Sequence, residues 1–215
     1  MCAGRVDMAH MIGPLLQGAD GVFVGSCLPG ECHYTSGNFQ AQGRIRLVEM
    51  ILRRIGLEPR RLTMKMMSSA EGPKFVEYVT EFVHDIKEIG PLGAKEGIPE
   101  EELRLKLTAV LGAVESEKVR WVVGKRSEFT ETGNLYGEVF TDHEIGRMFE
   151  EIVADECDLQ EMVLRLKKHS LTAKDLASEM RASPHVVVRR LADLLRLRRV
   201  EVSDDGGTPL WKATG

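Results

Sequence analysis

The sequence predicts an α/β protein in which a small parallel sheet with helices comes first and a second, largely helical unit comes last. Two short apolar runs, at 22–24 and 62–66, are each followed by apolar residues at helical spacing, which is the β-α-β-α order of a parallel sheet. Residues 155–215 carry three further helical patterns and one hairpin pattern. Hydrophobic residues make up 43% of the chain and charged residues 29%, as is usual for a globular protein.

The first three helices are bounded by recognisable end signals. A helix at 7–17 ends before Gly18, which stands where a C′ glycine is expected. A second helix begins near Ser36 or Asn38, either of which can cap it, and closes at Gly56. Its apolar stripe consists of Ile45, Val48, Leu52 and Ile55. A third helix, which Gly90-Pro91 stops, carries the stripe Phe75, Val79, Phe82, Ile86 and Ile89.

The two strands define the expected sheet. The run Val22–Val24 is apolar throughout, which is typical of a strand buried on both faces, whereas 62–66 alternates apolar and polar residues. A sheet of two strands is marginal by itself. We therefore expect residues 1–92 to form an incomplete Rossmann- or flavodoxin-like βαβα domain. Either the start of the chain truncates this domain, or a partner subunit completes it.

The middle of the chain, residues 93–154, is expected to be a helical linker region. A short polar linker at 93–98 leads into one long helix at 99–123. Residues 124–142 predict an irregular connection, and a further helix is expected at 142–154.

Residues 155–215 are expected to form a docking domain that resembles a winged helix-turn-helix. One helix is marked by apolar residues at 159–166, a second by its cap at Thr172, and a third by Ser183 in front of a proline. A turn at 204–207 then joins the two strands of a hairpin.

The arginines of that domain do not predict DNA binding. Five of them lie on or just after the third helix: Arg189, Arg190, Arg196, Arg198 and Arg199. Residues 155–215 nevertheless contain ten acidic residues beside eleven lysines and arginines, so their charges nearly cancel. The expected wing tip at Asp204-Asp205 is also acidic. Valines also occupy helix positions that would need polar, base-reading side chains. We expect the arginines to meet acidic surface on a partner protein.

Composition excludes several classes of protein. The net charge of −4 gives no general attraction to nucleic acid. No apolar stretch approaches the ~20 residues that cross a bilayer, and the N-terminus lacks the pattern of a signal peptide. We therefore expect a cytoplasmic protein with no nucleic-acid partner and no membrane insertion. In that compartment the four cysteines are not expected to form structural disulfides.

Three of the four cysteines gather around the first strand. Cys27 follows this strand directly, Cys32 returns toward it through the turn at Pro29-Gly30, and Cys2 precedes the first helix. Thiolates gathered at the end of a strand are what an iron–sulfur cluster needs. The alternative is that these cysteines are small buried apolar side chains. We find no catalytic triad, Walker loop or dinucleotide motif, so no catalytic residue is assigned.

The same residues resemble a known family, the delta (iron–sulfur) subunit of methyl-viologen-reducing hydrogenase, over roughly residues 1–140. The likeness is carried by Cys2-Ala3-Gly4-Arg5-Val6-Asp7, Gly18-Ala19-Asp20-Gly21-Val22, Cys27, Pro29-Gly30-Glu31-Cys32-His33-Tyr34, Gly37-Asn38, Ser69, Glu71-Gly72 and Lys74-Phe75. Its most specific part is the Cys-x4-Cys-His-Tyr block. Family members carry a further strand and a pair of cysteines ahead of the segment that matches Cys2.

The resemblance implies a [2Fe–2S] cluster with Cys2, Cys27 and Cys32 as ligands. A cluster of this type needs four ligands. The fourth comes from an upstream segment, from a partner, or from His33 or Cys157, which are weaker candidates. If the cluster has been lost, the cysteines have only a packing role.

The predicted function is therefore that of a non-catalytic electron-transfer subunit in an oxidoreductase complex. The resemblance implies a heterodisulfide-reductase-A-like flavoprotein as one partner, with FAD only in that partner. The other partner would be a hydrogenase, a formate dehydrogenase or a benzoyl-CoA-reductase-type module. Two alternatives remain: a structural adaptor of the same complex without a cluster, and a redox-responsive DNA-binding regulator.

Overall fold

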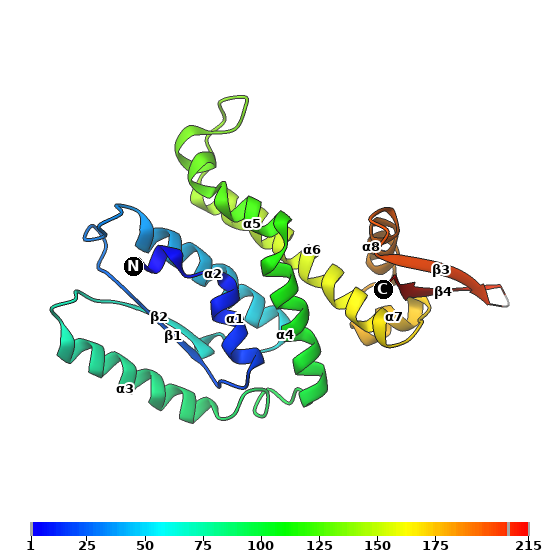
Figure 1. Cartoon of the computed structure of the whole chain (residues 1–215), viewed down its shortest axis with the longest axis horizontal. Helices are drawn as coiled ribbons and strands as arrows, with labels where there is room; N and C mark the ends of the chain where they lie inside the picture. Colours follow the sequence, from blue (N-terminus) through cyan, green and yellow to red (C-terminus); the bar gives the residue numbers. More distant parts are fainter. Residues whose placement is uncertain (1, 206, 215) are drawn as a thin grey trace. The chain divides into compact units, whose positions relative to one another are not determined.

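A computed structural model describes residues 2–205 and 207–214, without the side chains of Asp204 and Asp205. The chain divides into two compact units, Met1–Ala154 and Asp155–Gly215. Figure 1 shows the elements of both units in sequence colours. Within the described residues, no helix is both long enough and apolar enough to span a membrane.

The first unit opens with the expected β-α-β-α order. Its N-terminal elements are η1 (Ala3–Arg5), α1 (Met8–Leu16), β1 (Val22–Ser26), α2 (Gly37–Ile55), η2 (Pro59–Arg61), β2 (Leu62–Met66) and α3 (Gly72–Ile89). The strands β1 and β2 run parallel, in register from Val22 opposite Leu62 to Ser26 opposite Met66. The predicted ends of the first two helices are confirmed, because Gly18 and Gly56 both have positive φ angles just after their helices. The prediction of a small parallel α/β unit is therefore confirmed.

The two faces of this sheet are unequally covered. Val24 and Ser26 are buried, while Phe23, which alternates with them, contacts the rings of Phe75 and Phe82 on α3. Ile89 is the buried residue of α3, and half of Phe75 is exposed. The helix α3, with eighteen residues, covers more area than a two-stranded sheet offers, because neighbouring strands lie only about 4.8 Å apart. Burial of the strand on both faces is therefore only partly realised.

The main core of the first unit lies among its helices. The helix α1 packs on α2 and on α4 (Glu100–Glu115), and α4 also packs on α5 (Glu117–Gly124). Among the residues at this core that are at most 1% exposed are Met11, Ile12, Leu15, Val48, Ile51, Leu52, Val110, Ala113, Val114 and Val119. The N-terminal segment of the chain is thus anchored by apolar contacts on both sides of α1.

One predicted helix is divided in the structure, and one predicted cap lacks its side-chain hydrogen bond. The single helix expected at 99–123 is divided at Ser116, which has an extended backbone and accepts the N–H of Val119 as the cap of α5. A serine competes with the helix in this way because its hydroxyl can replace a backbone partner. Ser36 is the N-cap residue of α2, at one of the two expected positions, but its side chain makes no cap hydrogen bond. Asn38 lies inside α2 and instead donates to the carbonyl of Leu28 at 2.9 Å.

The region expected to be irregular contains a π-helical turn, η3 (Glu128–Thr132). It is followed by α6 (Asp142–Lys168), which replaces the two helices expected at 142–154 and 159–166 by one continuous helix. No glycine or proline stands between Gly146 and Lys168 to interrupt it. The border between the two compact units falls inside this helix.

The second unit contains the end of α6, α7 (Ala173–Glu179), α8 (Pro184–Arg196) and the antiparallel strands β3 (Val200–Asp205) and β4 (Thr208–Ala213). Thr172 caps α7, as expected, and Leu171 forms an isolated bridge with Trp211. Its fully buried side chains include Met162, Leu166, Leu176, Val187, Leu191 and Leu194. The expected turn at 204–207 includes Gly206, which lies outside the described residues. The assignment to the winged-helix class stays a prediction.

Candidate metal centre

The three N-terminal cysteines are brought together by the ends of three elements. Cys27 directly follows β1, and Cys32 is buried in the loop between β1 and α2. Cys2 is the N-cap of η1, where its sulfur accepts the N–H of Gly4 at 3.4 Å. The loop after β1 starts at the carboxyl end of a parallel strand, which is where open α/β sheets place their ligand sites.

The closest pair of these thiols joins the chain start to the loop. The sulfurs of Cys2 and Cys32 lie 3.6 Å apart. Two thiolates on one tetrahedral metal, each at about 2.3 Å from it, would lie about 3.8 Å apart. The sulfurs of Cys2, Cys27 and Cys32, all within the described residues, do not all lie within 4.8 Å of one another. The spacing therefore suits two thiolates on one metal and the third on a neighbouring metal better than three on a single ion.

Gly37, the first residue of α2, leaves room for the two close sulfurs. A β-carbon at Gly37 would stand 2.3 Å from the Cys2 sulfur and 3.1 Å from the Cys32 sulfur. Gly4 is equally confined, because a β-carbon there would stand 2.8 Å from the α-carbon of Gly37. The chain start and α2 thus meet through two glycines, and the thiols line the contact.

The electrostatic surroundings of the two loop thiols differ. Desolvation on burial opposes ionisation of Cys32, but the backbone N–H groups of Tyr34, Asn38 and Gly37 and the thiol of Cys2 favour its thiolate and lower its pKa to about 7. The pKa of Cys27 is raised, first by burial and then by the neighbouring Cys32 thiol. The site therefore stabilises one thiolate at neutral pH and couples a second thiol to it.

Ser26 supplies a polar atom without a partner at this place. Its side-chain oxygen is buried and makes no hydrogen bond of normal geometry. It lies at the end of β1, beside Cys27, and opposes the rise of the Cys27 pKa. Buried hydroxyls are usually satisfied. A sulfur or metal-bound group carried by these cysteines would give the Ser26 hydroxyl an acceptor, so the donor set and its surroundings fit an iron–sulfur group.

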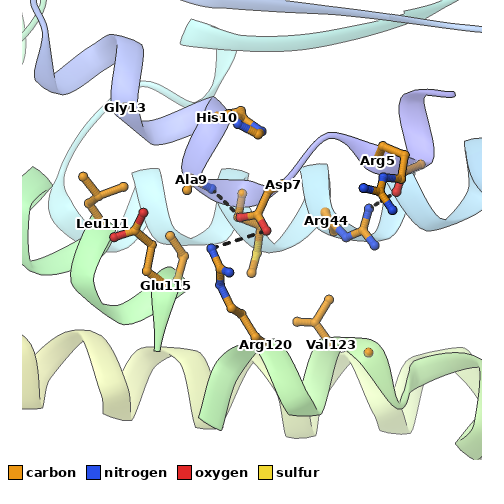
Figure 2. Close-up of a pocket in the computed structure, with 14 residues that line it drawn as sticks. Arg5, Asp7, Ala9, His10, Gly13, Arg44, Leu111, Glu115, Arg120 and Val123 are labelled. Carbon is orange, nitrogen blue, oxygen red and sulfur yellow. Dashed lines mark hydrogen bonds and ion pairs between the residues drawn. The ribbon is translucent and has the colours of Figure 1, made fainter. Parts of the chain in front are cut away.

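Arg44 of α2 holds the segment that carries Cys2. Its Nη1 donates to the carbonyl of Gly4 at 2.5 Å and to that of Val6 at 3.4 Å. Burial lowers the pKa of this guanidinium, although the charge of Asp7 opposes the shift. Asp7 in turn accepts the N–H of Ala9 at 2.9 Å and pairs with Arg120 of α5 at 3.7 Å. These contacts line a half-open groove of about 700 Å³ beside η1 and α1 (Figure 2).

The weaker fourth-ligand candidates are not joined to this cluster by any contact described. The ring of His33 is exposed and stands edge-on to that of Tyr34, with centroids 5.2 Å apart. Cys157 is buried in α6 and belongs to the second unit. Both assignments stay predictions. The sequence alone does not point to Ser26 or Arg44, since neither carries a motif and both act through contacts with distant segments or a neighbouring thiol.

A different group of metal-ligand types lies on α3. The side chains of His84, Asp85 and Glu88 bring ligand atoms within 4.8 Å of one another. All three stand on one surface turn, and the side chain of His84 is 80% exposed. Exposed acidic groups of this kind are common without a bound ion, so the thiols remain the candidate centre.

Comparison with known proteins finds a family and several relatives that resemble part of this chain. Residues 1–90 match the family described as methyl-viologen-reducing hydrogenase, delta subunit. An iron-sulfur subunit of the F420-non-reducing hydrogenase of Archaeoglobus profundus is 43% identical over 90 residues, which are 42% of this chain and 66% of that protein. The vhu iron-sulfur subunit of the F420-non-reducing hydrogenase of Methanopyrus kandleri is 42% identical over 91 residues, 42% of this chain and 69% of that protein.

A second kind of relative is much longer. One subunit of the ferredoxin:CoB-CoM heterodisulfide reductase of Methanosarcina mazei is 43% identical over 95 residues, which are 44% of this chain. The match spans only 12% of that protein. The chain is therefore similar both to most of a hydrogenase subunit and to a small part of a heterodisulfide reductase subunit.

Proposed function

The chain belongs, through residues 1–90, to the methyl-viologen-reducing hydrogenase delta-subunit family, and from this premise we propose that it is an electron-transfer subunit of a redox complex. The observation that carries the proposal is the meeting of Cys2, Cys27 and Cys32 in a site that stabilises thiolate. The relatives are named as iron-sulfur subunits, which agrees with a thiolate site.

The residues that would hold a [2Fe–2S] cluster are Cys2, Cys27 and Cys32. When bound, such a cluster accepts and releases one electron at a time. The chain contributes the Gly4 N–H, which points at the Cys2 sulfur, and the N–H groups at the start of α2 around Cys32. Donors of this kind favour the more negative, reduced state and raise the reduction potential. The fourth ligand is proposed to come from outside these three, with His33, Cys157, an upstream segment or a partner as sources.

The proposed partners follow from the two kinds of relative. Similarity both to a hydrogenase subunit and to part of a heterodisulfide reductase subunit suits a position between two such modules. We infer that this chain relays electrons between a heterodisulfide-reductase-A-like flavoprotein, which carries FAD, and a second redox module. That module is a hydrogenase, a formate dehydrogenase or a benzoyl-CoA-reductase-type assembly.

A second function, that of an adaptor without a cluster, is favoured by one observation. The described contacts bring only three thiols to the site, one fewer than a [2Fe–2S] cluster needs. In that case the close Cys2–Cys32 pair only packs the chain start against α2. The two functions differ in iron content and agree in the complex that they assemble.

The test uses the complex isolated without oxygen from cells that express the chain or a variant. We expect iron and acid-labile sulfide in proportion to this subunit, with a [2Fe–2S] signal in electron paramagnetic resonance after dithionite reduction. Cys27→Ala and Cys32→Ala should each lose that signal and stop electron transfer, while the complex stays assembled. Cys157→Ala tests one proposed source of the fourth ligand: loss of the signal would identify Cys157 as that ligand, and a retained signal would exclude it. Wild-type iron content in the Cys27 and Cys32 variants would contradict the relay and leave the adaptor.

A further inference from the structure

The helix α8 has an apolar strip besides the one that enters the core. Val187, Leu191 and Leu194 are fully buried, as residues spaced four and three apart on one face should be. Val188 and Leu195 form a second pair seven residues apart, and they are 51% and 42% exposed. Ala192 lies between them at helical spacing and is half-buried. The exposed apolar residues are therefore aligned along the helix rather than scattered.

Three of the five arginines on or after α8 are occupied within the unit. Arg190 forms ion pairs with Asp155 and Asp158 of α6, and Arg199 donates to the side-chain oxygen of Gln160 at 2.9 Å. Arg196 pairs with Asp193, one turn earlier in α8, at 3.0 Å.

Two of these arginines remain available. Arg189 and Arg198 are exposed, and within the described part of the chain their side chains have no polar partner. Arg189 follows Val188 on the helix, and Arg198 stands two residues after the helix ends. The apolar strip is therefore accompanied by two unpaired cations, while Asp193, the carboxylate of α8, is paired with Arg196.

We propose that this α8 outer face, formed by Val188, Ala192 and Leu195 with Arg189 and Arg198, docks an amphipathic helix of a partner protein whose apolar stripe is flanked by aspartate or glutamate. An apolar strip about two turns long is the size of contact that two helices make. Unpaired arginines beside it select acidic neighbours on the partner.

Other occupants suit the α8 outer face less well. DNA would need polar side chains on the helix to read base edges, whereas Val188 and Leu195 are apolar, and two of the arginines are turned toward α6. A second copy of the chain would bring the same patch against itself and so place arginine against arginine. The α8 outer face shares no residue with the cluster site proposed for the first unit, so either can hold without the other.

A zero-length cross-link tests the acidic neighbours directly. The full chain with Arg189→Lys or Arg198→Lys keeps its positive charge and presents an amine, which a carbodiimide joins to a carboxylate in contact. In the complex isolated from cells, we expect the new lysine to be joined to Asp or Glu in an amphipathic helical segment of another polypeptide, identified by mass spectrometry. A link only to a second copy of this chain, or no link at either position, overturns the proposal.

A second measurement tests the apolar strip. Val188→Glu with Leu195→Glu should leave the melting temperature of the chain unchanged, because both positions are exposed. In the complex without cross-linker, the double change should weaken binding of the polypeptide that the cross-link identified about tenfold or more, measured as its dissociation on dilution. The matched control is Lys174→Glu with Val202→Glu, which changes an exposed lysine of α7 and an exposed valine of β3 and should leave retention unchanged. Equal loss in both pairs, or unchanged retention in the first, contradicts the proposal. DNA binding would also contradict the proposal: the unaltered chain would bind a 30-base-pair DNA duplex at low salt, and the Val188→Glu and Leu195→Glu changes would abolish that binding.

Discussion

At the residue scale, the candidate centre depends on what surrounds each sulfur. Gly37 admits the sulfurs of Cys2 and Cys32 because it has no side chain, and backbone N–H groups favour the Cys32 thiolate. Ser26 adds a buried hydroxyl without a normal partner. None of these neighbours changes the identity of a ligand, but each sets how readily the thiols bind a metal.

Gly37→Ala is expected to abolish iron retention. The added methyl would stand 2.3 Å from the Cys2 sulfur, so Cys2 must leave Cys32. Alanine also favours the helix at this position, and the fold should therefore persist. Gly146→Ala in α6, where nothing lies within 4 Å of the added carbon, is the matched control and should keep the iron. Iron per subunit measures the loss, and circular dichroism checks that each variant is folded. Retained iron in Gly37→Ala would exclude a metal role for the Cys2–Cys32 pair.

The metal-free chain should show one thiol that ionises near neutral pH. The pKa of Cys32 is lowered to about 7 from an ordinary value near 9, so its thiolate is favoured in the folded state. The contribution of Cys32 to stability is therefore present above the ordinary thiol pKa and is lost as the pH falls through about 7. Alkylation of Cys32 by iodoacetamide, followed by mass spectrometry, should rise with a midpoint near that pH, and Cys27 should react only at higher pH. Equal pH profiles for the two thiols would refute the assigned environments.

At the element scale, the first unit is tied together at both ends of its sheet. Arg44 of α2 fastens the segment of Cys2 at the carboxyl end of the strands. Arg61, where η2 leads into β2, is fully buried at the other end. It pairs with Glu96 through two nitrogens, at 2.7 and 2.9 Å, and also donates to the carbonyls of Asp20, Gly90 and Pro91. Arg61 thereby joins the start of β1, the end of α3 and the following linker.

Arg61→Ala is expected to destabilise the first unit by about 3–5 kcal/mol, because it leaves the Glu96 carboxylate and three carbonyls without their donor. Arg60→Ala is the control: Arg60 is exposed, and its pairs with Glu58 and Glu88 should contribute at most about 1 kcal/mol. Urea unfolding of both variants measures the difference. A loss below about 1 kcal/mol for Arg61→Ala would mean that the buried network adds little beyond packing.

At the scale of the whole molecule, the thiols connect segments that are far apart in sequence but lie within one compact unit. Cys2 and Cys32 are thirty positions apart, and both belong to Met1–Ala154. The α8 outer face belongs to Asp155–Gly215, so the two proposed activities are carried by different units.

Cluster loading should therefore slow hydrogen exchange in the first unit at η1 and at residues 27–38, because the bound group joins these segments to each other. Residues 170–214 should exchange equally in loaded and metal-free protein. Mass spectrometry of the two forms measures this. Slower exchange around Cys157 as well would identify it as the fourth ligand, whereas no change at η1 would remove Cys2 from the ligand set.

The sequence by itself determined the order of elements and the residues worth testing. Apolar spacing and terminal glycines predicted α1, α2, β2 and α3, and the position of Cys27 after β1 predicted a site there, because these signals act over a few neighbouring residues. Only the tertiary structure decided that Cys2 meets Cys32, that Arg44 holds the chain start, and that Arg190 and Arg199 turn toward α6. It also joined two expected helices into α6. Such contacts link residues tens of positions apart, so they depend on how helices pack and leave no local pattern in the chain.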